Sequence, residues 1–412
     1  MEIKRIILGM QMLFVAFGAL VLVPLLTGLD ANVALFTAGV GTLLFHLVTK
    51  GKIPVFLASS FAYIAPIGAA THLYGLKGTL GGLVAAGFVQ IFFAGLIKKY
   101  GIAIVHRFLP SHVIGPVIIV IGLSLAPVAI GMTKNSDGQL NNVTVALIAM
   151  CTTIFISLFA KGTFKLVPIL GGIIAGYTAA FFFGLVSIQP VIDAPWFSIP
   201  AFVMPEFDWR AILFIIPVAL APTIEHIGDI MVISSVTGKK YYEDPGFHRT
   251  LFGDGIATSF AGMVGGPPNT TYSEVTGAVA LTKVFDPRVL QISAVFAILL
   301  SFFGKLGAFL QTIPAPVMGG IMIVLFGTIA SIGIKNMVEH KVDFTSNKNL
   351  IIVAVILIVG VGGASLSFGQ FTLAGIGLSG LAGVVLNIIL PESNDNKDIA
   401  GDPEETNYEK LG

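Results

Sequence analysis

The sequence predicts an all-α polytopic membrane protein of about fourteen transmembrane helices, arranged as two inverted seven-helix repeats. The first observation is composition: 55% of the 412 residues are apolar and only 11% are charged, against roughly 25% charged residues in an ordinary soluble domain. The second is a set of long segments without Asp, Glu, Lys or Arg, including 6–29, 108–133 and 349–391. The third is a pair of irregular segments at matching positions of the two halves, which predicts a short two-stranded ribbon in broken helices 3 and 10.

Individual spans follow from apolar runs bounded by turn signals, since a helix needs about 20 apolar residues to cross the hydrocarbon core. The first run is too long for a signal peptide and lacks a small-x-small cleavage site, so we expect a true span. The run 349–391 can hold two spans joined by a turn near Gly369. The predicted spans are 6–28, 31–49, 53–72, 78–97, 110–132, 142–160, 166–188, 210–235, 249–265, 272–284, 288–310, 314–336, 347–366 and 371–391.

The distribution of basic residues predicts that both termini lie in the cytoplasm. With the N-terminus inside and fourteen spans, nineteen of the 23 Lys and Arg residues fall on the inner side, as the positive-inside rule requires. A missed or extra span would have scrambled this bias. The acidic segment 392–412 is expected to be a solvated cytoplasmic tail without a fold of its own.

The third and tenth spans begin with Pro, Ser and Thr instead of a smooth apolar run, in PVFLASSFAYIAP (54–66) and GGPPNTTYSEVTG (265–277). Either these residues merely kink two spans, or they mark the interrupted helices of an inverted-repeat transporter, which we favour. Extended backbone cannot face lipid unpaired, so segments 58–60 and 269–271 are expected to pair as a ribbon. The half-helices after Ser60 and Tyr272 would then direct free N–H groups toward the centre.

Four acidic residues remain within the spans, namely Glu225, Asp229, Asp254 and Glu274. An intramembrane carboxylate is costly and indicates a functional site. Glu225 and Asp229 lie four residues apart on one helix face, and Glu274 opens the half-helix of span ten. The alternative for Asp229 and Asp254 is a solvated position near a cytoplasmic helix end. His226 points about 100° away from Glu225 and is interpreted as a packed or hydrogen-bonded histidine instead of a ligand.

Several classes of protein are disfavoured. Lys plus Arg (23) nearly balances Asp plus Glu (22), which argues against a nucleic-acid partner. The single cysteine, Cys151, excludes an intrachain disulfide, and no His, Asp and Glu cluster has the spacing of a metal site. The chain also lacks a P-loop and a G-x-S-x-G motif. We therefore expect no enzyme activity, no catalytic residues, no metal and no cofactor.

Five segments carry a more specific pattern: GKIPVFLASSFAYIAP, APTIEHIGD, DPGFHRTLFGDG, PPNTTYSEVTGAVALTKV and PAPVMGG. Together they resemble the nucleobase–ascorbate transporter family (nucleobase:cation symporter 2), and within it the bacterial uracil permeases. The resemblance runs from span one to span fourteen. It implies a core domain (1–109 and 209–312), a gate domain (110–208 and 313–391), a homodimer, and import of uracil with protons by alternating access across the bacterial inner membrane.

The resemblance also implies roles for individual residues. Glu225 matches the glutamate that binds a pyrimidine N–H, and Glu274 matches an acidic position that is usually glutamine in purine-selective relatives. Asp229, with Glu225 and Glu274, is the candidate for proton coupling. The other substrate-binding candidates match positions whose backbone amides meet the base carbonyls, Phe61 and Ser273, and positions that line the ring faces, Tyr272, Ala19 and Phe326.

Three residues depart from the pattern of the family. Val275 stands where the family signature has asparagine, so a polar contact is lost. Phe326 and Asp229 stand where the best-known uracil permease has tyrosine and histidine. The change at Asp229 shifts the expected proton-sensing group from an imidazole to a carboxylate.

The chemistry of the candidate residues suits a flat, neutral pyrimidine, which needs two acceptors and two donors in one plane. Glu225 and Glu274 can supply the acceptors, and the two half-helix N-termini the donors. The alternatives are a xanthine or urate symporter of the same family, which Val275 keeps open, and coupling to sodium. A sulfate or bicarbonate carrier is disfavoured because it would need a cationic residue at the membrane midplane. An intramembrane aspartyl protease is disfavoured because it would need paired aspartates. A channel is disfavoured because it does not need paired interrupted helices.

Overall fold

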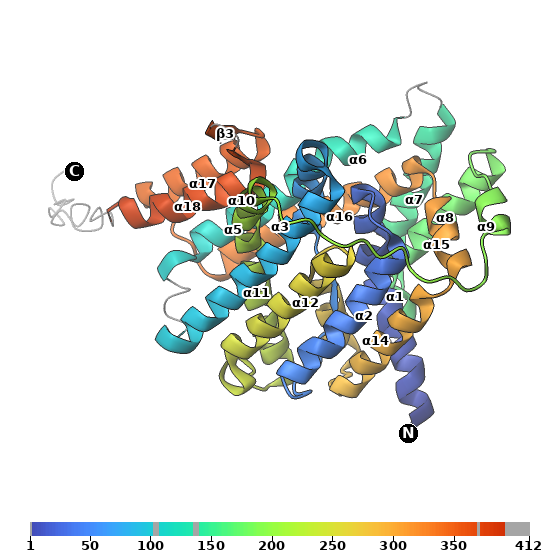
Figure 1. Cartoon of the computed structure of the whole chain (residues 1–412), viewed down its shortest axis with the longest axis horizontal. Coiled ribbons are helices and arrows are strands. Elements are labelled where there is room, and N and C mark those ends of the chain that lie inside the picture. The colour runs from blue at the N-terminus through green and yellow to red at the C-terminus, as the bar shows by residue number, and fades with distance from the viewer. Residues whose placement is uncertain (1, 102–106, 135–139, 369–370, 392–412) are drawn as a thin grey trace, which may run out of the picture.

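The computed structural model describes residues 2–101, 107–134, 140–368 and 371–391, and this part of the chain is mostly helical (Figure 1). The elements of the first half are α1 Glu2–Thr27, α2 Ala31–Val48, β1 Leu57–Ser59, η1 Phe61–Tyr63, α3 Ile64–Tyr100, α5 Ser111–Ser124, α6 Ala126–Thr133, α7 Leu140–Phe159, η2 Gly162–Leu166, α8 Pro168–Phe182 and α9 Gln189–Asp193. Those of the second half are α10 Trp209–Ile215, η3 Ile216–Ala219, α11 Leu220–Thr237, η4 Tyr242–Gly246, α12 Phe247–Val264, β2 Asn269–Thr271, α13 Ser273–Thr282, α14 Pro287–Ser301, α15 Gly304–Gln311, α16 Ala315–Glu339, α17 Asn347–Val361, β3 Ser365–Phe368, β4 Phe371–Ala374 and α18 Gly375–Ile389.

The predicted fold class is confirmed. Seven helical segments of the described chain are long and apolar enough to cross a membrane by themselves, and breaks shorten the others. The longest of the seven, Phe61–Tyr100, is itself interrupted inside α3 at Gly75, where φ is 75°. The break falls between the predicted third and fourth spans. Glycine suits this position because it adopts a positive φ without steric cost.

Two predicted spans are broken where the sequence suggested continuous helices. Span 110–132 divides at Leu125 into α5 and α6, since Pro127 in the next turn has no N–H to donate to the preceding turn. Span 288–310 divides into α14 and α15 at Phe302 and Phe303, and Phe303 forms an isolated antiparallel bridge with Phe197. Phe197 and Phe303 are far apart in the sequence, so no local sequence pattern predicts their contact.

The boundaries of the last two predicted spans were wrong. Span 347–366 ends at Val361, where Gly362 and Gly363 follow and Gly363 has a φ of 66°. The chain then forms an antiparallel hairpin of β3 and β4, and α18 begins only at Gly375. The turn predicted near Gly369 and the tail 392–412 lie outside the described residues.

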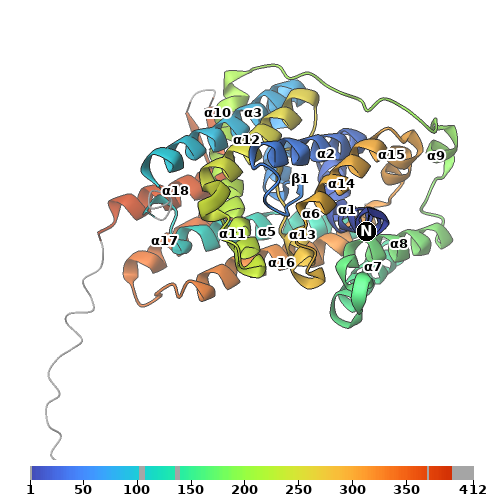
Figure 2. The same cartoon turned by 90° about the horizontal axis from the view of Figure 1, so that it is seen from below.

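The helices pack in two sets. In the first, α3 contacts α10 and α12, while α2 contacts α12 and α14, and α1 contacts α14. In the second, α16 contacts α5, α6, α7 and α8, and α17 contacts α5 and α18. Figures 1 and 2 both show α12, α2 and α14 side by side, and an extended segment between α9 and α10 that runs across the molecule. This segment is tied down by backbone hydrogen bonds such as Val203 N to Val264 O (3.2 Å) and Glu206 N to Lys77 O (3.0 Å).

One helix crossing in the first set is unusually close. A Cβ atom on Gly87 of α3 would collide with the carbonyl oxygen of Gly255 on α12, and the reverse substitution would collide in the same way. Small residues allow helix backbones to approach in this manner inside membranes. The crossing brings the polar residues next to these glycines, Gln90 and Asp254, within reach of each other.

Candidate functional site

The two interrupted segments meet as the predicted ribbon. β1 and β2 pair antiparallel, with Leu57 opposite Thr271, Ala58 opposite Thr270 and Ser59 opposite Asn269. The N–H of Ser60 continues the ladder by donating to Pro268 O at 2.9 Å. A ribbon of this kind satisfies the backbone of extended segments that lie far from water.

Each ribbon strand leads directly into a helix. η1 follows Ser60 and continues into α3, and α13 follows Tyr272, as the sequence predicted. Neither N-terminus is capped by a side chain. The first N–H groups of a helix have no partner within the helix, so both termini can donate to an electronegative group between them.

The carboxylates lie on α11 and at the start of α13. Glu225 and Glu274 are partly exposed, whereas Asp229 is buried. Glu225 is close enough to Asp229 and Glu274 to interact with both electrostatically. The Ser273 hydroxyl donates to Asp229 Oδ1 at 2.6 Å and so joins the first turn of α13 to α11. The structure thus brings together the residues that the sequence singled out around Glu225.

Aromatic side chains lie beside these groups. The ring centroid of Phe61 is 6.2 Å from that of Tyr272 and 6.4 Å from that of Phe326, the latter in an edge-on arrangement. All three rings are buried, as is Ala19 of α1, whose backbone lies near the Tyr272 hydroxyl. Aromatic faces and edges of this kind can cover a flat ring.

A second polar cluster, formed by Asp254, Gln90 and His226, contacts the ribbon at Thr271. Asp254 is completely buried and accepts hydrogen bonds from Gln90 Nε2 at 2.9 Å and from the backbone N–H of Thr271 at 3.1 Å. Its Oδ1 lies 3.4 Å from His226 Nδ1. The solvated alternative for Asp254, and for buried Asp229, is therefore wrong, and the interpretation of His226 as a packed side chain agrees with its complete burial.

The sequence did not identify Gln90 or the ribbon contacts of Thr258, whose hydroxyl donates to Asn269 O at 2.8 Å. The available signal for Gln90 was a long polar side chain within the otherwise apolar run 78–97. Within the described chain, no group of three His, Cys, Asp or Glu side chains could hold a metal ion.

Comparison with known proteins identifies this arrangement. A sequence model described as the permease family matches residues 3–367. The chain belongs to the permease family. A relative from Pasteurella multocida (strain Pm70), named probable uracil permease, is 53% identical over 395 residues, which cover 95% of each chain. The uracil permease of Bacillus caldolyticus is 46% identical over 396 residues, or 94% of this chain and 92% of the relative.

Solved structures with the same fold are membrane transporters. The transmembrane domain of a cyanobacterial bicarbonate transporter, BicA, aligns with a TM-score of 0.64 at 16% identity, covering 94% of this chain and 97% of that one. The murine Slc26a9 anion transporter aligns with a TM-score of 0.71 at 11% identity, covering 94% of this chain and 68% of that one. At such identities the likeness supports the fold alone, and it confirms two inverted seven-helix repeats.

Membership of the permease family confirms two further predictions. Permeases move solutes across membranes and are not enzymes, so the expectation that the chain has no enzyme activity is confirmed by its relatives. With its apolar spans, the permease is a multi-pass membrane protein. The roles of the individual site residues stay predictions.

Proposed function

We propose that this permease imports uracil. The observation that carries the proposal is the pair of partly exposed carboxylates, Glu225 and Glu274, beside two uncapped half-helix N-termini in a chain 53% identical to a probable uracil permease. Uracil presents two N–H donors and two carbonyl acceptors in one plane. A site built from hydrogen-bond partners of the opposite kind rejects analogues that leave its buried groups unpaired.

The proposed roles are those that the resemblance to the nucleobase–ascorbate transporter family implies, and the arrangement of the side chains is compatible with them. Glu225 and Glu274 accept from the two N–H groups of the base, and the backbone amides of Phe61 and Ser273 donate to its carbonyl oxygens. Tyr272, Phe326 and Ala19 cover the faces and edges of the ring, which the centroid distances of 6.2 Å and 6.4 Å around Phe61 support. Each hydrogen-bonding group of the neutral base thus meets a group of the opposite kind on the protein.

Uptake is coupled to protons through Asp229. Its carboxylate accepts from Ser273 on the first turn of α13, so a change in its protonation reaches the half-helix that carries Glu274. Glu225 and Glu274 share this role because Glu225 lies within electrostatic range of both Asp229 and Glu274, and Glu274 lies within range of Asp229. Sodium is the rival coupling ion, since carboxylates and unwound backbone can also hold it.

The transport cycle is alternating access between a core domain (1–109 and 209–312) and a gate domain (110–208 and 313–391). The two packing sets support this division, because α16 contacts α5, α6, α7 and α8, while α3 contacts α10 and α12. The protein works as a homodimer in the bacterial inner membrane, with both termini in the cytoplasm. The excess of Lys and Arg on the inner side supports that orientation.

Uptake of radiolabelled uracil in a strain without its own nucleobase permeases tests the proposal. Wild type should accumulate uracil, and Glu225→Gln should abolish saturable uptake at normal expression. Glu206→Gln is the matched control, because Glu206 lies in the exposed segment before α10 and pairs with Lys77 at 3.2 Å. Near-normal uptake by Glu225→Gln would remove Glu225 from the site. Stronger competition by unlabelled xanthine than by uracil against wild type would replace uracil with a purine, the alternative that Val275 keeps open.

A further inference from the structure

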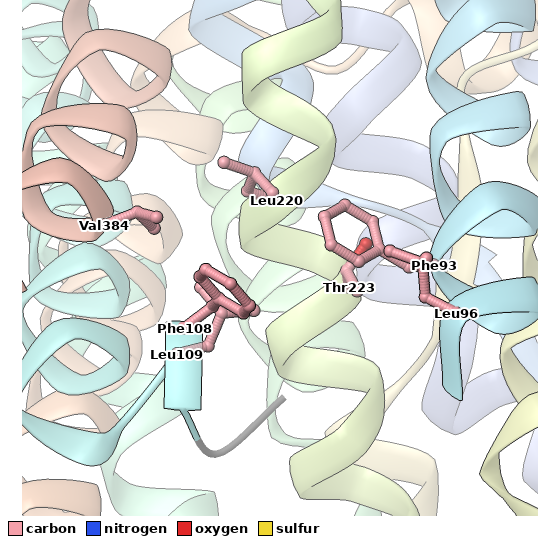
Figure 3. A pocket seen from close by; sticks show the side chains of 7 residues that line it. All are labelled: Phe93, Leu96, Phe108, Leu109, Leu220, Thr223 and Val384. Carbon is pink, nitrogen blue, oxygen red and sulfur yellow. The ribbon is translucent and has the colours of Figure 1, made fainter. Parts of the chain in front are cut away.

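A cavity of about 200 Å³ lies away from the candidate site, between helices of the two packing sets (Figure 3). On one side its wall is formed by Phe93 and Leu96 of α3 and by Leu220 and Thr223 of α11. On the other side the wall is formed by Val384 of α18 and by the turn before α5, which carries Phe108 and Leu109. Of the lining residues, Val384 belongs to the proposed gate domain and the others to the proposed core domain, so the cavity lies at the boundary between the two.

The lining is apolar throughout. Thr223 is the one residue with a side-chain oxygen, and its hydroxyl donates to Ala219 O of the same helix at 2.7 Å. No polar atom of the lining is open to the cavity. Since an apolar cavity of roughly 150 Å³ stays dry and binds small hydrocarbons, an occupant of this larger space must be apolar too.

Three cations stand close in the sequence to residues that line the cavity. Lys98 and Lys99 follow Leu96 at the end of α3, and Arg107 directly precedes Phe108. All three side chains are exposed, and none forms an ion pair with a carboxylate within the described chain. Lys99 Nζ lies 5.0 Å from the ring centroid of Tyr100, at the same end of α3. Basic residues beside an apolar space complement a molecule with an anionic head and an apolar tail.

We propose that this cavity holds an acyl chain of an anionic phospholipid from the surrounding bilayer, with the headgroup phosphate at Lys98, Lys99 and Arg107. The lipid-facing side of α3 supports this source. Phe92 is 62% exposed next to cavity-lining Phe93, so the bilayer and the cavity meet along one helix. The three cations select the headgroup, since each basic residue near a membrane surface attracts anionic lipid.

The bound chain would act on the helix of the candidate site. Thr223 and Glu225 are two residues apart on α11, or roughly 200° around the helix, so the acyl chain lies against the face opposite Glu225. The other wall is held by Asn387 of α18, which donates to Arg107 O at 3.0 Å and contacts His112 Nε2 at 2.9 Å. Occupancy therefore influences how α11 moves against α5 and α18.

Native mass spectrometry of the purified full chain, after incubation with phosphatidylglycerol or phosphatidylcholine, tests the acyl-chain site without any transport assay. Val384→Trp fills the cavity and should reduce bound phosphatidylglycerol. Val385→Trp is the matched control, because Val385 is 41% exposed on the neighbouring lipid-facing side. Equal retention of the lipid by both folded variants would overturn the assignment of the cavity.

A second comparison tests the headgroup contacts at surface positions, where substitution does not disturb packing. The triple variant Lys98→Gln, Lys99→Gln and Arg107→Gln should bind phosphatidylglycerol more weakly by roughly five-fold for each cation removed. The control removes the same charge at exposed Lys161, Lys165 and Lys239. An equal loss in both triple variants, or equal binding of phosphatidylcholine and phosphatidylglycerol by wild type, would overturn the anionic-lipid site.

Discussion

Replacing Asp254 with alanine tests whether the cluster of Asp254, Gln90 and His226 holds the candidate site in place. Asp254 accepts from Gln90 Nε2 at 2.9 Å and from Thr271 N at 3.1 Å, and all of these residues are buried. Alanine leaves both donors without a partner. Because Thr271 is the last residue of β2 and α13 begins two residues later, the start of the half-helix loses its anchor.

The expected loss follows from the two hydrogen bonds. Side-chain hydrogen bonds inside membrane proteins contribute about 0.6 kcal/mol on average and about 1.7 kcal/mol at most. We take this range for the hydrogen bond from Gln90 to Asp254. A buried backbone N–H left dry, here that of Thr271, costs about 1–3 kcal/mol. The free energy of unfolding of Asp254→Ala should therefore fall by about 2–5 kcal/mol.

Asp254→Asn is the matched control. Asn keeps one oxygen for Thr271 N and turns its NH₂ group toward Gln90, whose Oε1 has no hydrogen-bond partner within the described chain. Rotation of the Gln90 amide then restores the contact, so the loss should be about 1 kcal/mol or less. Unfolding by SDS in mixed micelles gives both values, and equilibrium binding of uracil reports on the site. Equal stability of Asp254→Ala and wild type, or equal losses in the two variants, would refute this account.

The remaining predictions concern the site and one surface pair. Glu274→Gln should weaken uracil binding by roughly 1–3 kcal/mol because an amide mismatches an N–H donor of the base. Val275→Asn should change specificity less, since the side chain at position 275 points about 100° away from that of Glu274 on α13. Competition assays with uracil, thymine, xanthine and urate measure both effects. Asp229→Asn should retain binding but lose pH-sensitive accumulation, and a protonophore should collapse accumulation by wild type in sodium-free buffer; full accumulation under that treatment would point to sodium. Lys52 holds the pKa of exposed Asp244 below its usual range through a hydrogen bond. The stability from this pair is present above the ordinary pKa of aspartate and is lost as pH falls through the lowered value, so the melting temperatures of Asp244→Asn and wild type should converge in acid.

The number and order of the spans could be predicted from the sequence because apolar runs and basic loops report directly on the bilayer. The ribbon could be predicted as well, since β1 and β2 interrupt apolar runs with Pro, Ser and Thr at matching positions. The hairpin of β3 and β4 could not, because SLSF and FTLA are as apolar as a helix end. Here Gly362 and Gly363 decide the structure, and a glycine pair within a membrane span does not by itself end a helix.

The site was predicted as far as its residues carry their own signal, and the rest depends on how two helices cross. A carboxylate within a membrane span stands out alone, which is why Glu225, Asp229, Asp254 and Glu274 could be named from the sequence. The partner of Asp254 could not be named, because Gln90 lies 164 residues away and is one polar residue among many. Their hydrogen bond exists because α3 and α12 cross where Gly87 faces Gly255, and no side chain separates the two backbones. A larger residue at either glycine would move the helices apart and break the hydrogen bond from Gln90 to Asp254, so the two glycines help to position the carboxylate that accepts from Thr271 in the ribbon.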